Sequence, residues 1–358
     1  MTGHNSYEIT TLSDPAAIAT LEPEWDVLAE RTGIPFLRLD WLTAWCTAFG
    51  AGRLLIYAAR RDGDLVAVLP LVAKDSTLRS PTNAHTPVFL PLGGRAAVST
   101  LAASALTSGV GSLIVSHLPS DDPLFEALAE SSQRAGRLTW REAGQISPIV
   151  DTSGDLERYR HDLDRHTRRE LGRLRRKLEA ERKGTQIRPL AHPVDLQQEL
   201  QAALELEARG WKGHRRTAIL CRADTASFYR MVAADLARRG ELRLSTISAD
   251  GHLIAFDLCV VAHSRAWILK GAYDERYRRY APGLILLLAE IEHAFELGLQ
   301  AVELLGGADD YKRKFATDFR PHGALHSYRR LPVPLARLTY HRAARPILRR
   351  AYRALRPR

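Results

Sequence analysis

LLIYAARRDGDLVAVLPLVA at residues 54–73 and LRLSTISADGHLIAFDLCVV at residues 242–261 are the stretches that decide the fold. At a constant offset of 188 residues, the Asp-Gly pair at 62–63 falls on the Asp-Gly pair at 250–251. An Asp-Gly pair between two runs of β-forming residues is typical of a hairpin turn, because a type I′ turn needs positive φ at both central residues. The sequence therefore predicts the same β-hairpin in each half of the chain.

The segments around the two hairpins follow a similar order. In the first half, hydrophobic periodicity predicts helices at about 14–31, 39–49, 98–107 and 122–135, and strands at 112–117 and 137–142. In the second half, the corresponding helices are expected at about 194–209, 224–239, 283–297 and 308–318, and the strands at 265–271, 300–305 and 323–330. This order predicts an α/β fold of two tandem units, each a mixed, mostly antiparallel sheet flanked by helices.

The charge of the chain is concentrated in two segments. The 358 residues carry a formal net charge of +10, of which residues 331–358 contribute +8 and residues 157–183 contribute +5, leaving −3 for all other residues. Leucines 163, 171, 174 and 178 are helically spaced in the second of these segments, which predicts one long amphipathic helix. It is either a platform for an anionic ligand or, as charge runs usually are, a solvated helix face. The near-neutral body argues against a nucleic-acid-coating surface.

These features divide the chain into four parts: an N-terminal, non-catalytic unit at 1–150, a basic connecting helix at 151–185, a catalytic unit at 186–330 and an arginine-rich tail at 331–358. The tail mixes arginines with leucines, a pattern that suits an anionic membrane surface or docking on the parent domain. No signal-peptide pattern opens the chain, and its longest strongly apolar run, residues 284–289, is too short for a membrane span. We expect a cytoplasmic protein, membrane-peripheral if the tail binds lipid.

Several enzyme classes lack their signatures in this sequence. It contains no dinucleotide-binding glycine motif, Walker loop, nucleophile elbow or zincin helix. Its three cysteines are far apart, and His322 and His326 have no third ligand nearby in sequence, so we expect no metal.

The segment at 266–315 carries the strongest functional signal. A strand leads through a loop with Arg276, Arg278 and Arg279 into a helix that begins at Pro282-Gly283. Unpaired amides of a first helical turn, with the macrodipole behind them and arginines in front, form an anion site suited to a pyrophosphate. An ordinary capped helix with solvated arginines is the alternative.

Three motifs bring a family resemblance. The Pro282-Gly283 helix start, the EARGWKG run at 207–213 and the Tyr311-Lys312 pair resemble the catalytic half of the GNAT superfamily, specifically CelD/BcsL-type acetyltransferases, which are similar to Fem-type peptidoglycan transferases. The resemblance covers about 155–330 well and the first half only by its hairpin and element order. The chain departs from the family in having Ala281-Pro282-Gly283 in place of an Arg/Gln-x-x-Gly-x-Gly/Ala loop.

The resemblance implies an acetyl-CoA or other acyl-CoA between two strands that separate after residue 265. Its implied binding residues are Leu269, Lys270, Gly271, Ala272, Arg278, Arg279, Pro282, Gly283 and Leu284. The implied acceptor-binding residues are Glu207, Arg209, Trp211, Lys212, Tyr273, Asp310 and Lys312.

Acyl transfer needs a base for the acceptor and an acid for the departing thiolate. Asp257 and Glu303 are the candidate bases and Tyr311 the candidate acid. Strand alternation puts Glu303 on one face with Ala301 and Leu305, where a carboxylate is poorly placed for water and should have a raised pKa. An edge-facing salt bridge is the alternative for Glu303, and a solvent-facing strand residue is the alternative for Asp257.

The leading hypothesis is an acyl-CoA-dependent N- or O-acyltransferase that acts on a sugar, glycoconjugate or related polar acceptor. One alternative is Fem-type transfer from aminoacyl-tRNA, with the basic helix binding RNA phosphates. Another is a non-catalytic adaptor that binds membrane or nucleic acid through its tail. The near-neutral body disfavours both alternatives.

Overall fold

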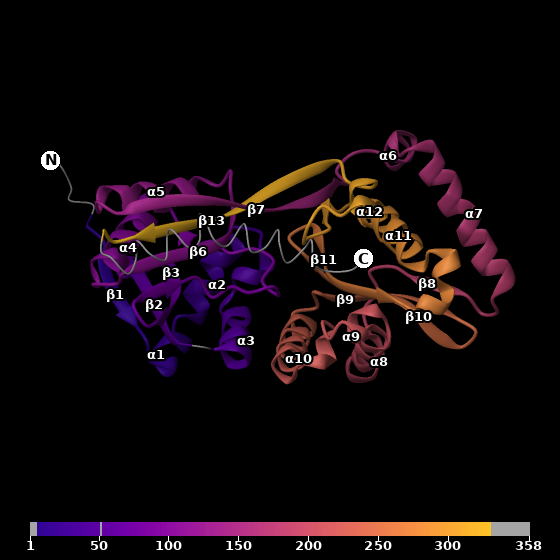
Figure 1. The fold of residues 1–358 in the computed structure, drawn as a ribbon, viewed down its shortest axis with the longest axis horizontal. Helices are drawn as coiled ribbons and strands as arrows, with labels where there is room; N and C mark the ends of the chain where they lie inside the picture. The colour runs from indigo at the N-terminus through magenta and orange to yellow at the C-terminus, as the bar shows by residue number, and fades with distance from the viewer. Residues whose placement is uncertain (1–5, 51, 331–358) are drawn as a thin grey trace.

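One continuous sheet runs through both halves of the molecule (Figure 1). The structure is a computed structural model that describes residues 6–50 and 52–330, so the arginine-rich tail lies outside the described residues. Within these ranges the strands lie in the order β1-β2-β3-β4-β6-β13-β7-β12-β11-β10-β9-β8, with β5 beside β3. The same residues include no helix of the length and apolarity that a membrane crossing requires.

The first half contains β1 (Glu8–Leu12), α1 (Pro15–Ala19), α2 (Glu22–Glu30), α3 (Leu39–Phe49), β2 (Arg53–Arg61), β3 (Asp64–Lys74), β4 (Thr77–Arg79), β5 (Leu92–Gly93), α4 (Arg95–Thr107), β6 (Ser112–Pro119), α5 (Pro123–Arg134) and β7 (Leu138–Asp151). The second half contains α6 (Leu156–Asp162), α7 (Arg165–Glu181), β8 (Gln186–Arg188), α8 (Leu196–Arg209), α9 (Trp211–His214), α10 (Ala223–Arg238), β9 (Leu242–Ala249), β10 (His252–Ala262), β11 (Arg265–Tyr273), α11 (Pro282–Glu296), β12 (Ala301–Glu303), α12 (Asp310–Arg313) and β13 (Asp318–Tyr328).

The two predicted hairpins are confirmed as β2–β3 and β9–β10. Asp62 and Gly63 have φ of 53° and 90°, and Asp250 and Gly251 have φ of 54° and 76°, as a type I′ turn requires. Each hairpin also contains a β-bulge shortly after the turn. The unpaired residues are Val66 and Ile254, which the same 188-residue offset relates. The internal repeat therefore extends to an irregularity of the pairing.

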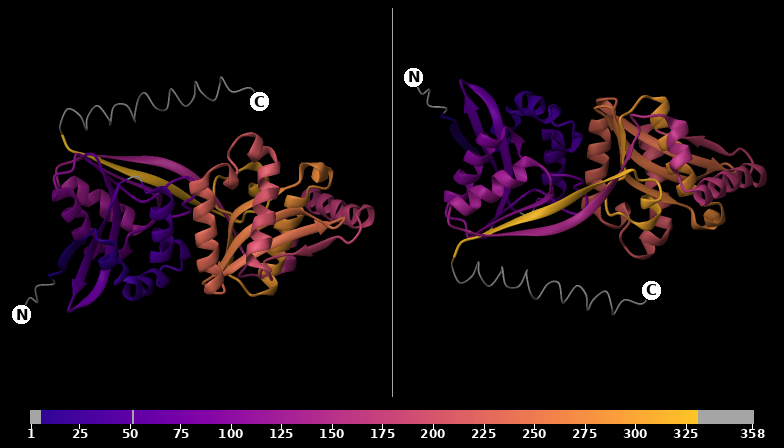
Figure 2. Two further views of the ribbon diagram at one scale, coloured as in Figure 1. Left: turned by 90° about the horizontal axis from the view of Figure 1, so that it is seen from below. Right: turned by 90° about the horizontal axis from the view of Figure 1, so that it is seen from above.

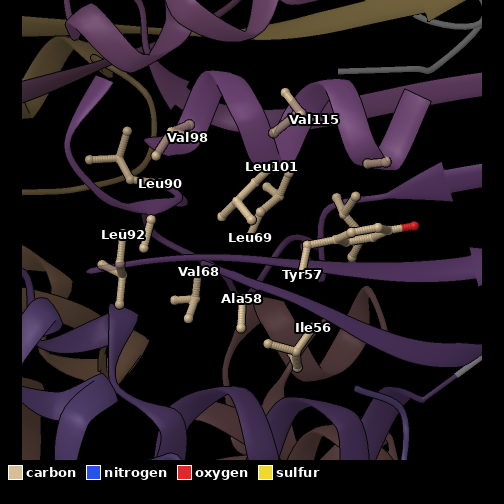
Figure 3. Close-up of a cluster of buried hydrophobic side chains, with 14 of the residues drawn as sticks. Ile56, Tyr57, Ala58, Val68, Leu69, Leu90, Leu92, Val98, Leu101 and Val115 are labelled. Atoms are coloured by element: carbon tan, nitrogen blue, oxygen red, sulfur yellow. The ribbon is translucent and has the colours of Figure 1, made fainter. Parts of the chain in front are cut away.

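The parallel strand pairs repeat as well, but their lengths differ. Thr77 of β4 pairs with Ser112, and Arg265 of β11, 188 residues later, pairs with Ala301. β4 ends after three residues, whereas β11 continues for nine. In the first half, the chain after β4 returns and buries Phe89, Leu90 and Leu92 in the core, where Figure 3 shows the two leucines with Val68 and Val98.

The last strands of the two halves are exchanged. β7 ends the first half but pairs with β12, and β13 ends the second half but pairs with β6. The two strands also pair with each other and run side by side from one half into the other (Figure 2). Residues 322–328, expected in the second unit, thus complete the sheet of the first.

Helices cover both faces of the second half and tie it to the first. α8 and α10 pack on one face of the β9–β11 strands, and α11 packs on the other. Phe36, Trp41 and Trp45 of the first half join the core beneath α8 and α10, with Trp41 edge-on to Phe228 of α10 at 5.2 Å between ring centroids. The two halves therefore share a hydrophobic core.

Three helix predictions are wrong in extent. The helix expected at 14–31 is divided into α1 and α2 by a turn at residues 20–21. The basic segment is two helices rather than one, because the chain leaves helical geometry at Leu163 and Asp164 caps α7 by accepting from the Thr167 N–H. The helix expected at 308–318 is reduced to the single turn of α12. The leucines at 171, 174 and 178 are buried as predicted, so the apolar face of α7 packs on the protein.

Candidate active site

β11 and β12 separate in the second half and leave one edge of β11 open. Their pairing ends at Trp267 and Glu303, whereas β11 stays paired with β10 as far as Tyr273. The separation follows from the backbone after β12, since Leu305 and Gly306 have φ of 49° and 61° and turn the chain away. The side chains of 268–273 are accordingly partly or fully exposed, in contrast to Trp267. The strands therefore separate just beyond residue 267, close to the predicted position.

Asp257 of β10 lies opposite a glycine of the neighbouring strand β11. Its cross-strand partner is Gly271, where a Cβ atom would stand 1.6 Å from the Asp257 Oδ1. A glycine is therefore required for the carboxyl group to occupy this position. Burial and the neighbouring Glu290 raise the pKa of Asp257 well above its ordinary value, and the Lys212 and Lys312 ammonium groups oppose this rise.

Two lysines lie on the two sides of the separating strands. Lys212 Nζ donates to the Gly271 carbonyl of β11 at 2.6 Å. Lys312 Nζ donates to the carbonyls of Leu304 and Leu305, which follow β12, at 3.0 and 2.7 Å. Burial and repulsion from Lys212 lower the pKa of Lys312. The opening is thus bordered by two fixed ammonium groups near one carboxyl group.

Lys212 is held by the EARGWKG run. Glu207 is 2% exposed; its Oε1 accepts from Lys212 Nζ and its Oε2 from the Ile219 N–H, both at 2.8 Å. Gly213 permits the turn between them, because a Cβ there would stand 1.7 Å from the Ala208 carbonyl oxygen. Both carboxylate oxygens of Glu207 are used within the protein, so it positions Lys212.

The other residues expected to bind the acceptor surround this opening more loosely. Arg209 and Asp310 are exposed, Tyr273 is 36% exposed and Trp211 is 47% exposed with the Arg215 guanidinium over its ring. These side chains are accessible to a ligand from solvent. The structure does not bring Arg209 or Asp310 into a hydrogen bond with the Asp257 cluster.

One residue of this region comes from the first half and was missed by sequence reasoning. His85 stacks on Phe49 and lies 3.3 Å from the Tyr229 hydroxyl, and burial and the Lys270 charge lower its pKa to about 4. Lys270 itself lies over the Tyr229 ring, and burial and Lys212 lower its pKa. No local pattern marks His85, because only the packing of the two halves brings it there.

Tyr311 keeps its proton at neutral pH. Burial and the nearby Asp257 raise its pKa to about 12, although 44% of the residue remains exposed. A phenol in this state is a hydrogen-bond donor, which agrees with the role of candidate acid.

The start of α11 has the expected backbone conformation, but two of the arginines before it form ion pairs within the protein. Ala281 adopts the left-handed conformation at φ 50°, Pro282 opens the helix, and the Gly283 amide belongs to the first turn, which no helix carbonyl can satisfy. Arg276 pairs with Asp274, and Arg279 pairs with Glu181 at 2.9 Å. Two of the three arginines expected at the helix start thus have carboxylate partners, whereas Arg278 is exposed.

Glu303 does not belong to this cluster. It is fully buried, and its Oε1 accepts from Arg265 at 2.7 Å and from Arg320 at 3.0 Å. Of the two interpretations of Glu303, a base with a raised pKa and a salt bridge, the structure supports the salt bridge, to which β13 contributes Arg320. His326 likewise pairs with Glu142 rather than with His322, and among residues 6–50 and 52–330 no group of three His, Cys, Asp or Glu side chains suits a metal.

Comparison with known proteins agrees with this geometry. A family model described as acetyltransferase (GNAT) domain matches residues 165–313. The solved structure of FemX is 14% identical, with a TM-score of 0.60 over 92% of this chain and 99% of its own. The C-terminal domain of a putative lysylphosphatidylglycerol synthetase from Agrobacterium fabrum is 14% identical, with a TM-score of 0.53 over 90% of this chain and 95% of its own.

A third structure, L-PGS from Bacillus licheniformis, is 13% identical, with a TM-score of 0.52 over 92% of this chain and 96% of its own. No curated protein matches the sequence. At such identities the structural likeness shows the fold. The family match shows a GNAT acetyltransferase domain, and with it an acyltransferase, at residues 165–313.

Proposed function

We propose that the protein transfers an acyl group from acyl-CoA to an amine or hydroxyl of a sugar, glycoconjugate or related polar acceptor. The single observation that supports this most is the open edge of β11 beside Asp257, with Lys212 and Lys312 fixed on its two sides. The sugar acceptor follows the resemblance to CelD/BcsL-type enzymes.

Acyl-CoA fits the open edge and the helix start. The thioester would lie along Leu269, Lys270, Gly271 and Ala272, whose strand amides include donors for a developing oxyanion. The pyrophosphate would lie on the first turn of α11 at Pro282, Gly283 and Leu284, with exposed Arg278 close in sequence. When bound, acyl-CoA supplies an activated acyl carbon.

The protein's own groups would then move two protons. Asp257 accepts the proton of the attacking amine or hydroxyl as the new C–N or C–O bond forms. Tyr311 gives its proton to the sulfur as the C–S bond breaks, and recovers one from Asp257 to complete the cycle. Lys212 and Lys312 stabilise negative charge at the opening, since each ammonium keeps N–H donors beyond its carbonyl bonds.

The first half lacks the means for this chemistry. β4 has three residues, whereas its counterpart β11 has nine, so the first half has no long open strand edge at this position. Phe89, Leu90 and Leu92 are instead buried in the core of the first half. We therefore propose that only the second half is catalytic and that the first half contributes His85 to the acceptor side.

Transfer from aminoacyl-tRNA is a second candidate, favoured by one observation. Arg165, Arg169 and Arg176 of α7 are exposed and have no ion pair among the described residues, as a phosphate-binding surface would.

Calorimetric titration of acetyl-CoA, free CoA and bulk tRNA into the full chain tests the proposal. We expect acetyl-CoA and CoA to bind, and Gly283→Asp to weaken both at least about tenfold, because it adds bulk and negative charge at the anion site. The matched control is Gly154→Asp, since a Cβ at Gly154 meets nothing within 4 Å. Binding of tRNA but not of CoA would replace the proposal by the second candidate.

A further inference from the structure

A buried carboxyl group lies behind the open edge of β11, on the sheet face that α11 covers. It belongs to Glu290 of α11, which is 0% exposed. Its neighbours on the core side of the helix, Leu286, Leu287 and Ile291, are buried apolar residues. A fully buried glutamate is rare, because removing an ionised carboxylate from water is costly. The acyl transfer proposed above does not use Glu290.

Glu290 and Asp257 belong to one polar cluster beneath α11. Asp257 and Cys259 are two residues apart on β10, where the pairing with β9 is regular, so both side chains point to the same face of the sheet. The Cys259 thiol donates to Glu290 Oε1 at 3.4 Å. The Cys259 sulfur also lies 3.9 Å from the hydroxyl of Ser245, the residue of β9 directly opposite Asp257. The Glu290 carboxyl group is therefore a neighbour of Asp257 on this face.

No cation neutralises Glu290 within the described part of the chain. Glu290 forms no ion pair there, and its buried Oε2 has no hydrogen-bond partner. Arg243, which is opposite Cys259 on β9, donates instead to the carbonyls of Gly240 and Leu242. An ionised Glu290 would thus be a buried charge without compensation, which costs several kcal/mol.

The remaining surroundings of Glu290 are apolar. The elements that pack against α11 at this level contribute Leu171 of α7, Ile268 of β11 and Val302 of β12. Burial raises the pKa of Glu290, and the nearby Ser245 and Cys259 only oppose this rise. Glu290 therefore holds a proton more firmly than an ordinary glutamate.

Asp257 differs from Glu290 in being accessible. It is partly exposed at the opening and has the Lys212 and Lys312 ammonium groups near it, whereas Glu290 is sealed behind it. Two carboxyl groups in one buried cluster do not ionise independently, because the second negative charge is repelled by the first. Loss of a proton by one group therefore depends on the charge of the other.

We propose that Asp257 and Glu290 form a carboxyl pair that shares one proton, and that Glu290, which lies out of a substrate's reach, is thereby a positioning residue for the acyl transfer. The negative charge on the pair holds the proton in place. Asp257 consequently binds a proton more firmly than a lone carboxylate would, and can take one from an amine or hydroxyl. This role rests on the proposed function, whereas the shared proton does not.

Infrared spectroscopy of the full chain tests the pair without any substrate, because a protonated carboxyl group has a carbonyl band of its own. We expect this band at neutral pH in the unmodified chain. In Asp257→Asn, the remaining carboxyl group should lose its proton at least about one pH unit lower, because the neighbouring charge is gone. Loss of the proton at the same pH in both chains would mean that the two groups are independent, and would overturn the proposal.

A pH–rate profile tests the role of Glu290. Glu290→Gln keeps the volume of the side chain and removes its charge, so the acid limb should move at least about one pH unit lower and kcat on the plateau should fall. Glu296→Gln, an exposed carboxylate on the same helix, is the control and should change neither quantity.

The two measurements separate the possible failures. A lower kcat in Glu290→Gln with an unmoved acid limb would assign Glu290 a structural role only and overturn the proposal. If the chain transfers no acyl group, the proposed function fails, and the infrared titration alone decides whether the pair exists. The comparison with Asp257→Asn decides this even where Glu290→Gln does not fold.

Discussion

The surroundings of Asp257 could be predicted only in part from the sequence. Its place on a hairpin strand could be predicted, but its contact with Gly271 depends on a bulge at Leu269, where the register between β10 and β11 shifts. A one-residue shift changes which residues face each other, and no local pattern reports it. The sequence left open whether Glu303 is a base or part of a salt bridge for a similar reason, since its partner Arg320 comes from a distant strand.

Asp257→Asn should lower kcat by about 10²- to 10⁴-fold with little change in acetyl-CoA affinity, because it removes the proton acceptor. Only the ionised carboxylate accepts a proton, so the rate of the unmodified enzyme should rise with pH through the raised pKa of Asp257. A pH–rate profile should therefore show an acid limb above the ordinary aspartate range. Glu205→Gln, an exposed carboxylate, is the control; full turnover in Asp257→Asn would remove Asp257 from the mechanism.

Gly271→Ala should also lower kcat, because the added Cβ would meet the Asp257 Oδ1 at 1.6 Å and displace the carboxyl group. The added methyl group should lower the melting temperature as well. Gly154→Ala, where the Cβ meets nothing within 4 Å, should change neither quantity. A Gly271→Ala enzyme with unchanged kcat would show that the carboxyl position is immaterial to the reaction.

At the level of elements, the hairpins and most helices could be predicted because their signals are local: turn residues, alternation and helical spacing. The break between α6 and α7 was missed although Asp164 is a common N-cap residue, because the leucine spacing continues across it. The exchange of β7 and β13 has no local signal at all, since either strand suits either sheet.

Whether the apolar face of α7 is part of the hydrophobic core can be tested by mutation. Leu178 is fully buried against the β9–β10 hairpin and the start of α11, so Leu178→Ala should reduce the free energy of unfolding by about 2–5 kcal/mol. Arg176→Ala, on the exposed face, should change it by no more than about 0.5 kcal/mol. Denaturant titration measures both, and equal small effects would mean that α7 is not part of the core.

At the scale of the whole molecule, a buried arginine joins the two halves through ion pairs. Arg38 pairs with residues of both halves, and its hydrogen bonds with Glu241 and Glu30 outweigh burial and raise its pKa above the ordinary arginine value. No local pattern indicates the contact between Arg38 and Glu241, which are 203 positions apart.

Arg38→Met should destabilise the protein by about 1–3 kcal/mol, because it leaves the partly exposed Glu30 and Glu241 without their guanidinium partner. Arg60→Met, which removes a more exposed pair with Glu24 inside the first half, should cost about 1 kcal/mol or less. Thermal unfolding compares the two variants, and a loss for Arg38→Met no greater than that for Arg60→Met would contradict this assignment.

The exchange of β7 and β13 also has a consequence for how the chain is made. During synthesis the first half emerges before the second, yet its sheet lacks β13 until residue 328 has left the ribosome. Until then β6 has an unpaired edge, which is prone to pair with other chains. We therefore expect the sheet of the first half to be completed only after residues 318–328 have been synthesised, so that the two halves finish folding together rather than one after the other.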